Sequence, residues 1–175
     1  MRRILVVGSG GAGKSTLARQ LGERLELPVV HLDRHYWQPG WVATEPDRWR
    51  ATVGRLAAAD AWVMDGNYGS TLDLRLPRAD LLVLCDLPRL VCLWAVLRRR
   101  WRSRATGRPD LHPGCPERLT PAFLRWIWSY PGRPRTHLLA AVAAHTPRLA
   151  VVRLRSRREV RRWLAGGMAY GRPPE

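Results

Sequence analysis

Residues 8–15 read Gly-Ser-Gly-Gly-Ala-Gly-Lys-Ser, which is the complete pattern G-x-x-x-x-G-K-[ST]. Glycines at this spacing let the backbone curl until successive N–H groups surround an anion, and a following helix adds its dipole. A lysine here reaches the β- and γ-phosphates of a nucleoside triphosphate, and the hydroxyl after it ligates Mg²⁺. We therefore predict an ATP-binding loop made of Gly8, Ser9, Gly10, Gly11, Ala12, Gly13, Lys14, Ser15 and Thr16.

The surroundings of this loop agree with that interpretation. A short apolar run, Ile4–Val7, precedes it, and leucines at positions 17, 21 and 25 follow at helical spacing. Lys14 is also the single lysine among 30 basic residues, all others being arginine. A chain that otherwise uses arginine throughout has lysine where a slim, flexible point charge is needed.

Acidic residues follow three further apolar runs. In an open parallel sheet, ligands lie beyond the carboxyl ends of the strands. Asp65 is predicted to hold Mg²⁺ through water, or else to cap the turn that follows it. Asp33 is predicted to orient or deprotonate an acceptor hydroxyl, or else to cap a helix or pair with Arg34. For Asp86 we expect a helix cap rather than a functional role.

Apolar runs alternate with helical patterns along the whole chain, which predicts a parallel sheet covered by helices on both faces. We expect an α/β fold with no internal repeat. The expected strands are Ile4–Val7, Pro28–Leu32, Ala61–Met64, Leu81–Cys85 and Leu149–Leu154. The expected helices are Thr16–Leu25, one starting at Pro46, one carrying the stripe Leu87 to Trp101, Pro121–Tyr130, Pro134–Ala144, and a last one ending at Gly166.

The chain has 175 residues and a formal net charge of +16, of which residues 88–175 contribute +15. Such a basic half favours a polyanionic partner: a phosphorylated small molecule, a nucleic acid or an anionic membrane. No apolar run is long enough to span a bilayer, and three cysteines without a CxxC pair argue against a disulfide or zinc scaffold. These features favour a cytoplasmic protein.

Residues 98–118 interrupt the pattern with seven arginines, several prolines and no periodicity. A lid whose arginines stabilise a transferring phosphoryl group is one interpretation. A passive basic surface and a nucleic-acid patch are the others. Trp94 and Trp101 lie on an apolar stripe, so we expect them in the core, as we do Trp126, Trp128 and Tyr130. Tyr36, Trp37 and Trp41 either line an acceptor pocket or pack as an aromatic loop.

The whole chain resembles the adenylate-kinase-related P-loop proteins labelled DNA topology modulation proteins. The resemblance rests on residues 8–16, His31-Leu-Asp33 with Trp37-Gln-Pro-Gly-Trp41, Asp65-Gly-Asn-Tyr68, 73–80, 114–119 and 152–156. It implies a nucleoside-monophosphate-kinase-like fold with five parallel strands in the order 2-3-1-4-5 and a lid. Residues 106–110 resemble a nucleotide-kinase lid segment, which implies phosphate-binding roles for Arg104 and Arg108.

These observations together predict one domain spanning residues 1–175, with a lid-like insertion at about 98–118. The expected activity is transfer of the γ-phosphoryl group of ATP to a small-molecule acceptor, with Lys14, Asp33, Arg104 and Arg108 as catalytic residues and Ser15 and Asp65 on Mg²⁺. The acceptor stays open, a nucleotide being one candidate. We expect a monomer or weak dimer with no membrane partner. The alternative is a nucleic-acid-associated P-loop ATPase that affects DNA topology.

Overall fold

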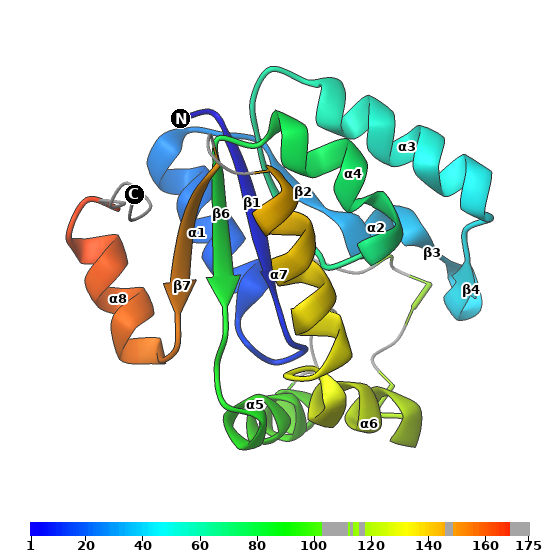
Figure 1. Cartoon of the computed structure of the whole chain (residues 1–175). Helices are drawn as coiled ribbons and strands as arrows, with labels where there is room; N and C mark the ends of the chain where they lie inside the picture. Colours follow the sequence, from blue (N-terminus) through cyan, green and yellow to red (C-terminus); the bar gives the residue numbers. More distant parts are fainter. Residues whose placement is uncertain (103–111, 113, 116–117, 146–148, 169–175) are drawn as a thin grey trace.

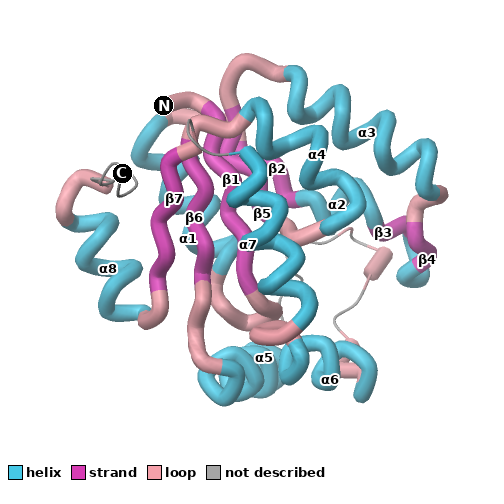
Figure 2. Tube along the Cα trace, viewed as in Figure 1, coloured by secondary structure: helices cyan, strands magenta, loops and turns pink. Residues whose placement is uncertain are grey.

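A computed structural model of the chain describes residues 1–102, 112, 114–115, 118–145 and 149–168. Its centre is a five-stranded parallel sheet in the order β2-β5-β1-β6-β7 (Figures 1 and 2). Counted within this sheet alone, the order is 2-3-1-4-5, as expected. The strands are β1 (Arg3–Gly8), β2 (Val29–His31), β5 (Trp62–Asp65), β6 (Leu81–Cys85) and β7 (Ala150–Leu154).

A small antiparallel ribbon, β3 (Trp37–Gln38) with β4 (Val42–Ala43), stands apart from the sheet. Six of the eight helices in the described residues follow the predicted patterns closely, whereas two short ones were not predicted. The helices are α1 (Lys14–Leu25), α2 (Leu32–Tyr36), α3 (Pro46–Ala58), α4 (Leu72–Arg75), α5 (Arg89–Arg102), α6 (Pro121–Ser129), α7 (Arg133–His145) and α8 (Arg157–Ala165), with 3-10 turns η1 (Pro39–Trp41), η2 (Gly69–Thr71) and η3 (Leu76–Arg78).

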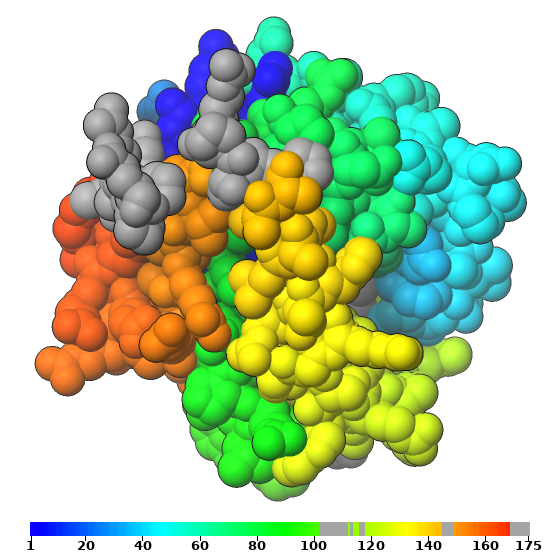
Figure 3. All heavy atoms as spheres, in the orientation of Figure 1, coloured from blue at the N-terminus to red at the C-terminus, as the bar shows by residue number. Residues whose placement is uncertain are grey.

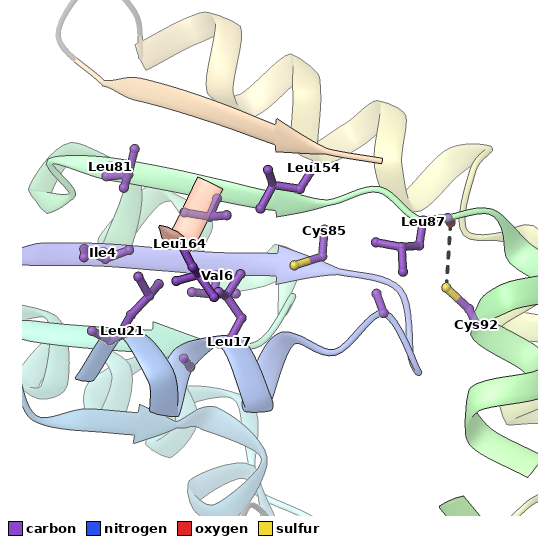
Figure 4. Close-up of a cluster of buried hydrophobic side chains, with 14 of the residues drawn as sticks. Ile4, Val6, Leu17, Leu21, Leu81, Cys85, Leu87, Cys92, Leu154 and Leu164 are labelled. Carbon is purple, nitrogen blue, oxygen red and sulfur yellow. Dashed lines mark hydrogen bonds between the residues drawn. The ribbon is translucent and has the colours of Figure 1, made fainter. Parts of the chain in front are cut away.

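Alternate residues of the central strand β1 point to opposite faces of the sheet, and each face has its own core. Ile4 and Val6 face Leu17 and Leu21 of α1 (Figure 4). Residues of α5, α6 and α8 join this cluster. Leu5 and Val7 face the opposite cluster, built with residues of α3, α4 and α7. The molecule is therefore a three-layer α/β/α sandwich, as the continuous apolar strands predicted.

Two expectations about acidic residues need correction. The strand predicted at Pro28–Leu32 ends at His31, and Leu32 begins α2, so Asp33 lies in a short helix rather than at a strand end. Asp86 does not cap the next helix, which begins three residues later at Arg89. Its carboxylate instead accepts hydrogen bonds from Arg135 of α7 and Arg153 of β7.

The apolar stripe of α5 is also placed differently from the prediction. Trp94 is 54% exposed and Trp101 is 78% exposed, so neither belongs to the core. Trp128 of α6 is 50% exposed, whereas Tyr130 is buried as expected. The helix buries a different face, through Cys92 and Val96, because that side packs on the phosphate loop.

Candidate functional site

The predicted phosphate loop joins β1 to α1 and has the backbone that its glycines allow. Gly8, Gly11 and Gly13 have φ values of 146°, 80° and 89°, a region that side chains rarely adopt. A Cβ on Gly11 would lie 2.2 Å from the carbonyl oxygen of Cys92, so α5 packs directly against the loop. The Lys14 ammonium donates to the carbonyl of Ser9 at 2.9 Å. The lysine is thus held beside the hollow that is predicted to bind an anion.

Asn67, in the loop after the neighbouring strand β5, holds the start of the phosphate loop. The Gly8 N–H donates to Asn67 Oδ1 at 3.0 Å, and Asn67 Nδ2 donates to the Gly8 carbonyl at 2.8 Å. The two bonds fix the orientation of the amide, because only its oxygen accepts and only its nitrogen donates. The hydroxyl of Tyr130 lies 3.4 Å from the same Oδ1. One side chain therefore ties the loop after β5 to the phosphate loop.

Arg75 of α4 holds the loop after β5 in turn. Its side chain is fully buried and donates to the carbonyls of Gly66, Asn67, Tyr68 and Thr71 at 2.6–3.3 Å. Burial lowers the pKa of the guanidinium to about 10, so the group stays charged at neutral pH. Because the planar guanidinium of Arg75 binds four backbone carbonyls at once, it holds the backbone of this loop in a single arrangement.

The loop after β5 presents the Tyr68 hydroxyl to Asp33, the acid predicted to be catalytic. Tyr68 donates to Asp33 Oδ1 at 2.6 Å. Burial, with the nearby Asp33 charge, raises the pKa of Tyr68 far above its ordinary value, so the phenol remains a donor. Tyr68 and Trp41 both have positive φ values, 32° and 67°, and both line the cavity described below. Strained residues of this kind gather at functional sites.

Asp65 is the last residue of β5 and pairs with Val6 of β1, the strand that leads into the phosphate loop, so it lies where an acid that organises magnesium is expected. It is 5% exposed, and its Oδ1 lies 2.6 Å from His31 Nδ1 at the end of β2. Asp65 and Ser15 line the same cavity. Oxygen donors of these two kinds fit Mg²⁺, which binds through few protein ligands and keeps several waters. The residues present therefore fit the cation.

One cavity of about 880 Å³, a size that suits small-molecule ligands, is lined by eight of the predicted site residues: Gly10, Gly11, Gly13, Lys14, Ser15, Thr16, Asp33 and Asp65. The phosphate loop forms one part of it. Asp33, the ribbon tryptophans Trp37 and Trp41, and Tyr68 form another. The remaining lining residues come mainly from α1, β5, the loop after β5, α5, α6 and α7: Arg19, Asp65, Gly66, Asn67, Gly69, Leu72, Arg99, Arg118, Thr120, Phe123, Trp126, Tyr130, Pro134, His137 and Leu138.

Two of the three residues of the predicted aromatic loop thus line a pocket. Trp37 and Trp41 lie edge to face with ring centroids 5.3 Å apart, whereas Tyr36 packs against Trp49 and Tyr68.

The predicted catalytic arginines Arg104 and Arg108 lie outside the described residues. The cavity cations of the described part are Lys14, Arg19, Arg99 and Arg118. Sequence reasoning missed the structural roles of Asn67 and Arg75, although both stand within motifs of the resemblance.

Sheet order, phosphate loop and flanking helices define the fold of the P-loop kinases. Solved structures similar to this chain include the shikimate kinase from Acinetobacter baumannii in complex with shikimate (17% identity, TM-score 0.58). The match covers 96% of this chain and 91% of the shikimate kinase. The shikimate kinase from Aquifex aeolicus is 15% identical with a TM-score of 0.56, and the match covers 95% of this chain and 93% of that kinase. A gluconokinase from Sinorhizobium meliloti 1021 is 20% identical with a TM-score of 0.51, and the match covers 94% of this chain and 92% of the gluconokinase.

Sequence comparison is less informative than fold. No protein-family profile matches the chain. A curated relative, the uncharacterized protein YqaC of Bacillus subtilis (strain 168), is 24% identical over 131 residues, which span 74% of this chain and 72% of the relative. The likeness therefore establishes the fold, and the chemistry has to be argued from the site.

Proposed function

We propose that the chain is an ATP-dependent kinase that transfers the γ-phosphoryl group to a hydroxyl of a small-molecule acceptor. The observation that carries this proposal is one cavity lined both by Lys14 and Ser15 of a phosphate loop and by Asp33. Phosphoryl transfer needs an anion site for the triphosphate and a group that orients the attacking oxygen. The fold that this chain shares with small-molecule kinases is consistent with both.

In this mechanism the acceptor hydroxyl attacks the γ-phosphorus and the bond to the β-bridging oxygen breaks. The new O–P bond forms on the acceptor, ADP leaves, and the hydroxyl proton passes to Asp33. Tyr68 fixes the orientation of that carboxylate through its hydrogen bond. Lys14 offsets the charge that develops on the phosphoryl oxygens. Bound Mg²⁺, held from Ser15 and Asp65, would neutralise triphosphate charge.

The finer expectations enter as part of the same proposal. Arg104 and Arg108 are proposed to meet phosphate charge from a lid-like insertion at about 98–118 of a single domain. The motifs quoted above support membership of the topology-modulation group. ATP as co-substrate supports a cytoplasmic location, and a monomer or weak dimer is sufficient because one chain lines the cavity.

The test is transfer of label from γ-labelled ATP to a panel of nucleotides, sugars and other small hydroxyl acceptors. Lys14→Ala should abolish turnover with an unchanged melting temperature, and Lys14→Arg should fail as well because the wider guanidinium crowds the loop. Asp33→Asn should lose transfer but keep ATP binding. Asp47→Asn, an exposed acid on α3 outside the cavity, is the matched control. Full activity of Lys14→Ala would refute the assignment of the loop.

A nucleic-acid-associated ATPase is the second candidate, and the exposed arginines of α8 favour it. Arg157, Arg158, Arg161 and Arg162 are all exposed, and phosphoryl transfer gives them no role. That protein would hydrolyse ATP faster when DNA is added at physiological salt and would phosphorylate nothing in the panel. A kinase would bind DNA weakly, with a steep salt dependence, and its turnover would not respond.

A further inference from the structure

Helix α5 has two opposite apolar sides, one buried and one exposed. Cys92 and Val96 face the phosphate loop, and Arg99 lines the cavity. At about 100° per residue, the other side carries four apolar residues within an arc of about 60°. These residues, called here the α5 patch, are Leu90 (66% exposed), Trp94 (54%), Leu97 (46%) and Trp101 (78%).

The α5 patch forms part of an outer edge of the molecule. Helices α5 and α6 lie together beyond the carboxyl ends of the strands (Figures 1 and 2). In the space-filling view the green atoms of this region lie along the lower edge (Figure 3). Large apolar side chains grouped in this way on a surface mark an interaction site.

Arginines border the α5 patch on both sides. Arg89 and Arg100 fall on one flank and Arg98 on the other at helical spacing, and residues 89–102 contain no acidic residue. The Arg98 guanidinium lies 5.1 Å from the ring centroid of Trp94. On the α6 side, Arg89 lies 4.4 Å from the ring centroid of the exposed Trp128. The partner must therefore offer both an apolar phase and negative charge.

Three kinds of occupant fit these residues poorly. A second copy of the chain would bring arginine flanks against arginine flanks with no acid on α5 to pair them. The patch residues are spaced by four, three and four positions, which is the spacing of a coiled-coil interface. A partner helix would have to accommodate two indoles in that interface, where Leu, Ile and Val pack best. A nucleic acid would stack on the indoles but would leave Leu90 and Leu97 against polar groups, because aliphatic side chains offer no stacking surface.

We propose that the α5 patch docks this protein onto the surface of an anionic lipid bilayer. Helices that lie in a membrane interface combine Trp and Leu on one side with flanking basic residues, and indoles favour the headgroup level. The guanidinium groups then meet lipid phosphates while the apolar side chains enter the acyl boundary. This docking is independent of ATP turnover. None of the helices in the described segments is long and apolar enough to cross a bilayer, and surface docking needs no such helix.

This inference changes the expectation that the protein has no membrane partner. The basic half of the sequence admits an anionic membrane among its partners, but with the α5 tryptophans expected in the core there was no apolar surface to enter one. The inner side of the same helix contacts Gly11 and contributes Arg99 to the cavity. A docked molecule therefore holds its phosphate loop one helix thickness from the bilayer surface.

The experiment is sedimentation of the full chain with vesicles of phosphatidylcholine alone or mixed with phosphatidylglycerol. We expect binding to the mixed vesicles that weakens with added salt, and little binding to phosphatidylcholine. The double variant Leu97→Gln/Trp101→Gln should bind the mixed vesicles at least about tenfold more weakly, since two apolar side chains no longer enter the lipid. Arg98→Gln should weaken binding by roughly fivefold.

Val42→Gln is the matched control, because Val42 is 60% exposed on the ribbon, away from α5, and should bind like the wild type. The melting temperature of each variant shows that it is folded, and Leu90→Gln is the replacement if the double variant unfolds. Equal binding of the wild type and the double variant overturns the proposal, as does absence of binding to the mixed vesicles. It is also overturned if the patch variants abolish a dimer in light scattering, or oligonucleotide binding, while vesicle binding stays.

Discussion

The clamp between Asn67 and Gly8 offers a sharp test of how the phosphate loop is held. Asn67→Ala removes two hydrogen bonds to backbone groups, those from the Gly8 N–H at 3.0 Å and to the Gly8 carbonyl at 2.8 Å. Each such bond contributes about 0.5–1.5 kcal/mol, so the loss is about 1–3 kcal/mol. If it falls entirely on nucleotide binding, the Kd for ATP rises about 5- to 150-fold.

Asn67→Asp should be worse than Asn67→Ala, although aspartate has nearly the shape of asparagine. The carboxylate still accepts from the Gly8 N–H, but its second oxygen faces the Gly8 carbonyl where an N–H₂ group stood. It also adds a negative charge beside the site of the phosphates. The expected order of ATP affinity is wild type, then Asn67→Ala, then Asn67→Asp.

Calorimetric titration with ATP and Mg²⁺ measures the Kd, and a melting curve measures the effect on the fold. Ser70→Ala, in the turn η2 three residues further on, is the control, because Ser70 is exposed and the substitution keeps its carbonyl, which accepts from Arg50. If Asn67→Asp binds ATP like the wild type, the amide donor has no role in the site. If Asn67→Ala lowers only the melting temperature, the clamp supports the fold and not the nucleotide.

Three further changes test neighbouring parts of the structure. Tyr68→Phe removes a hydrogen bond that favours the ionised form of Asp33, so the acid limb of the profile of kcat/KM against pH should move to higher pH; an unchanged limb would separate Asp33 from the proton transfer. Gly11→Ala should abolish ATP binding in titrations, since its Cβ would lie 2.2 Å from a carbonyl oxygen, and normal binding would mean that α5 can retreat. Gly54→Ala, inside α3 with open space around it, should raise the free energy of unfolding by about 0.5–1 kcal/mol in urea titrations; a decrease would contradict the placement of Gly54 in the helix.

The elements and the phosphate loop could be predicted because their signals are local. A strand, a glycine-rich turn and a helix follow one another within residues 3–25; apolar spacing reveals the strand and the helix, and the glycine-lysine pattern reveals the turn. The role of Asp86 could not be read in this way, because its partners Arg135 and Arg153 lie 49 and 67 residues further along the chain. The same holds for Asn67 and Arg75, whose partners are backbone groups that leave no trace in residue type.

The tryptophans of α5 show a different limit. An apolar stripe has the same helical spacing whether a neighbouring element covers it or not, so Trp94 and Trp101 looked like core residues. Helix α5 buries Cys92 and Val96 instead, on the side opposite the stripe. Periodicity shows that a face is apolar, and only the packing of the other elements shows which of two apolar faces is covered.

The Lys14 ammonium, bonded to Ser9 within the phosphate loop, has a consequence for the chemical biology of this chain. It is the only side-chain primary amine in the sequence, so every lysine-directed reagent or modification has one possible side-chain target. Acylation there would remove the charge that a triphosphate needs, and bound nucleotide would shield the amine from acylation. Arginine at the other 29 basic positions leaves the surface with positive charge but without acylable side-chain amines. Labelling of a single amine would thus report directly on occupancy of the nucleotide site.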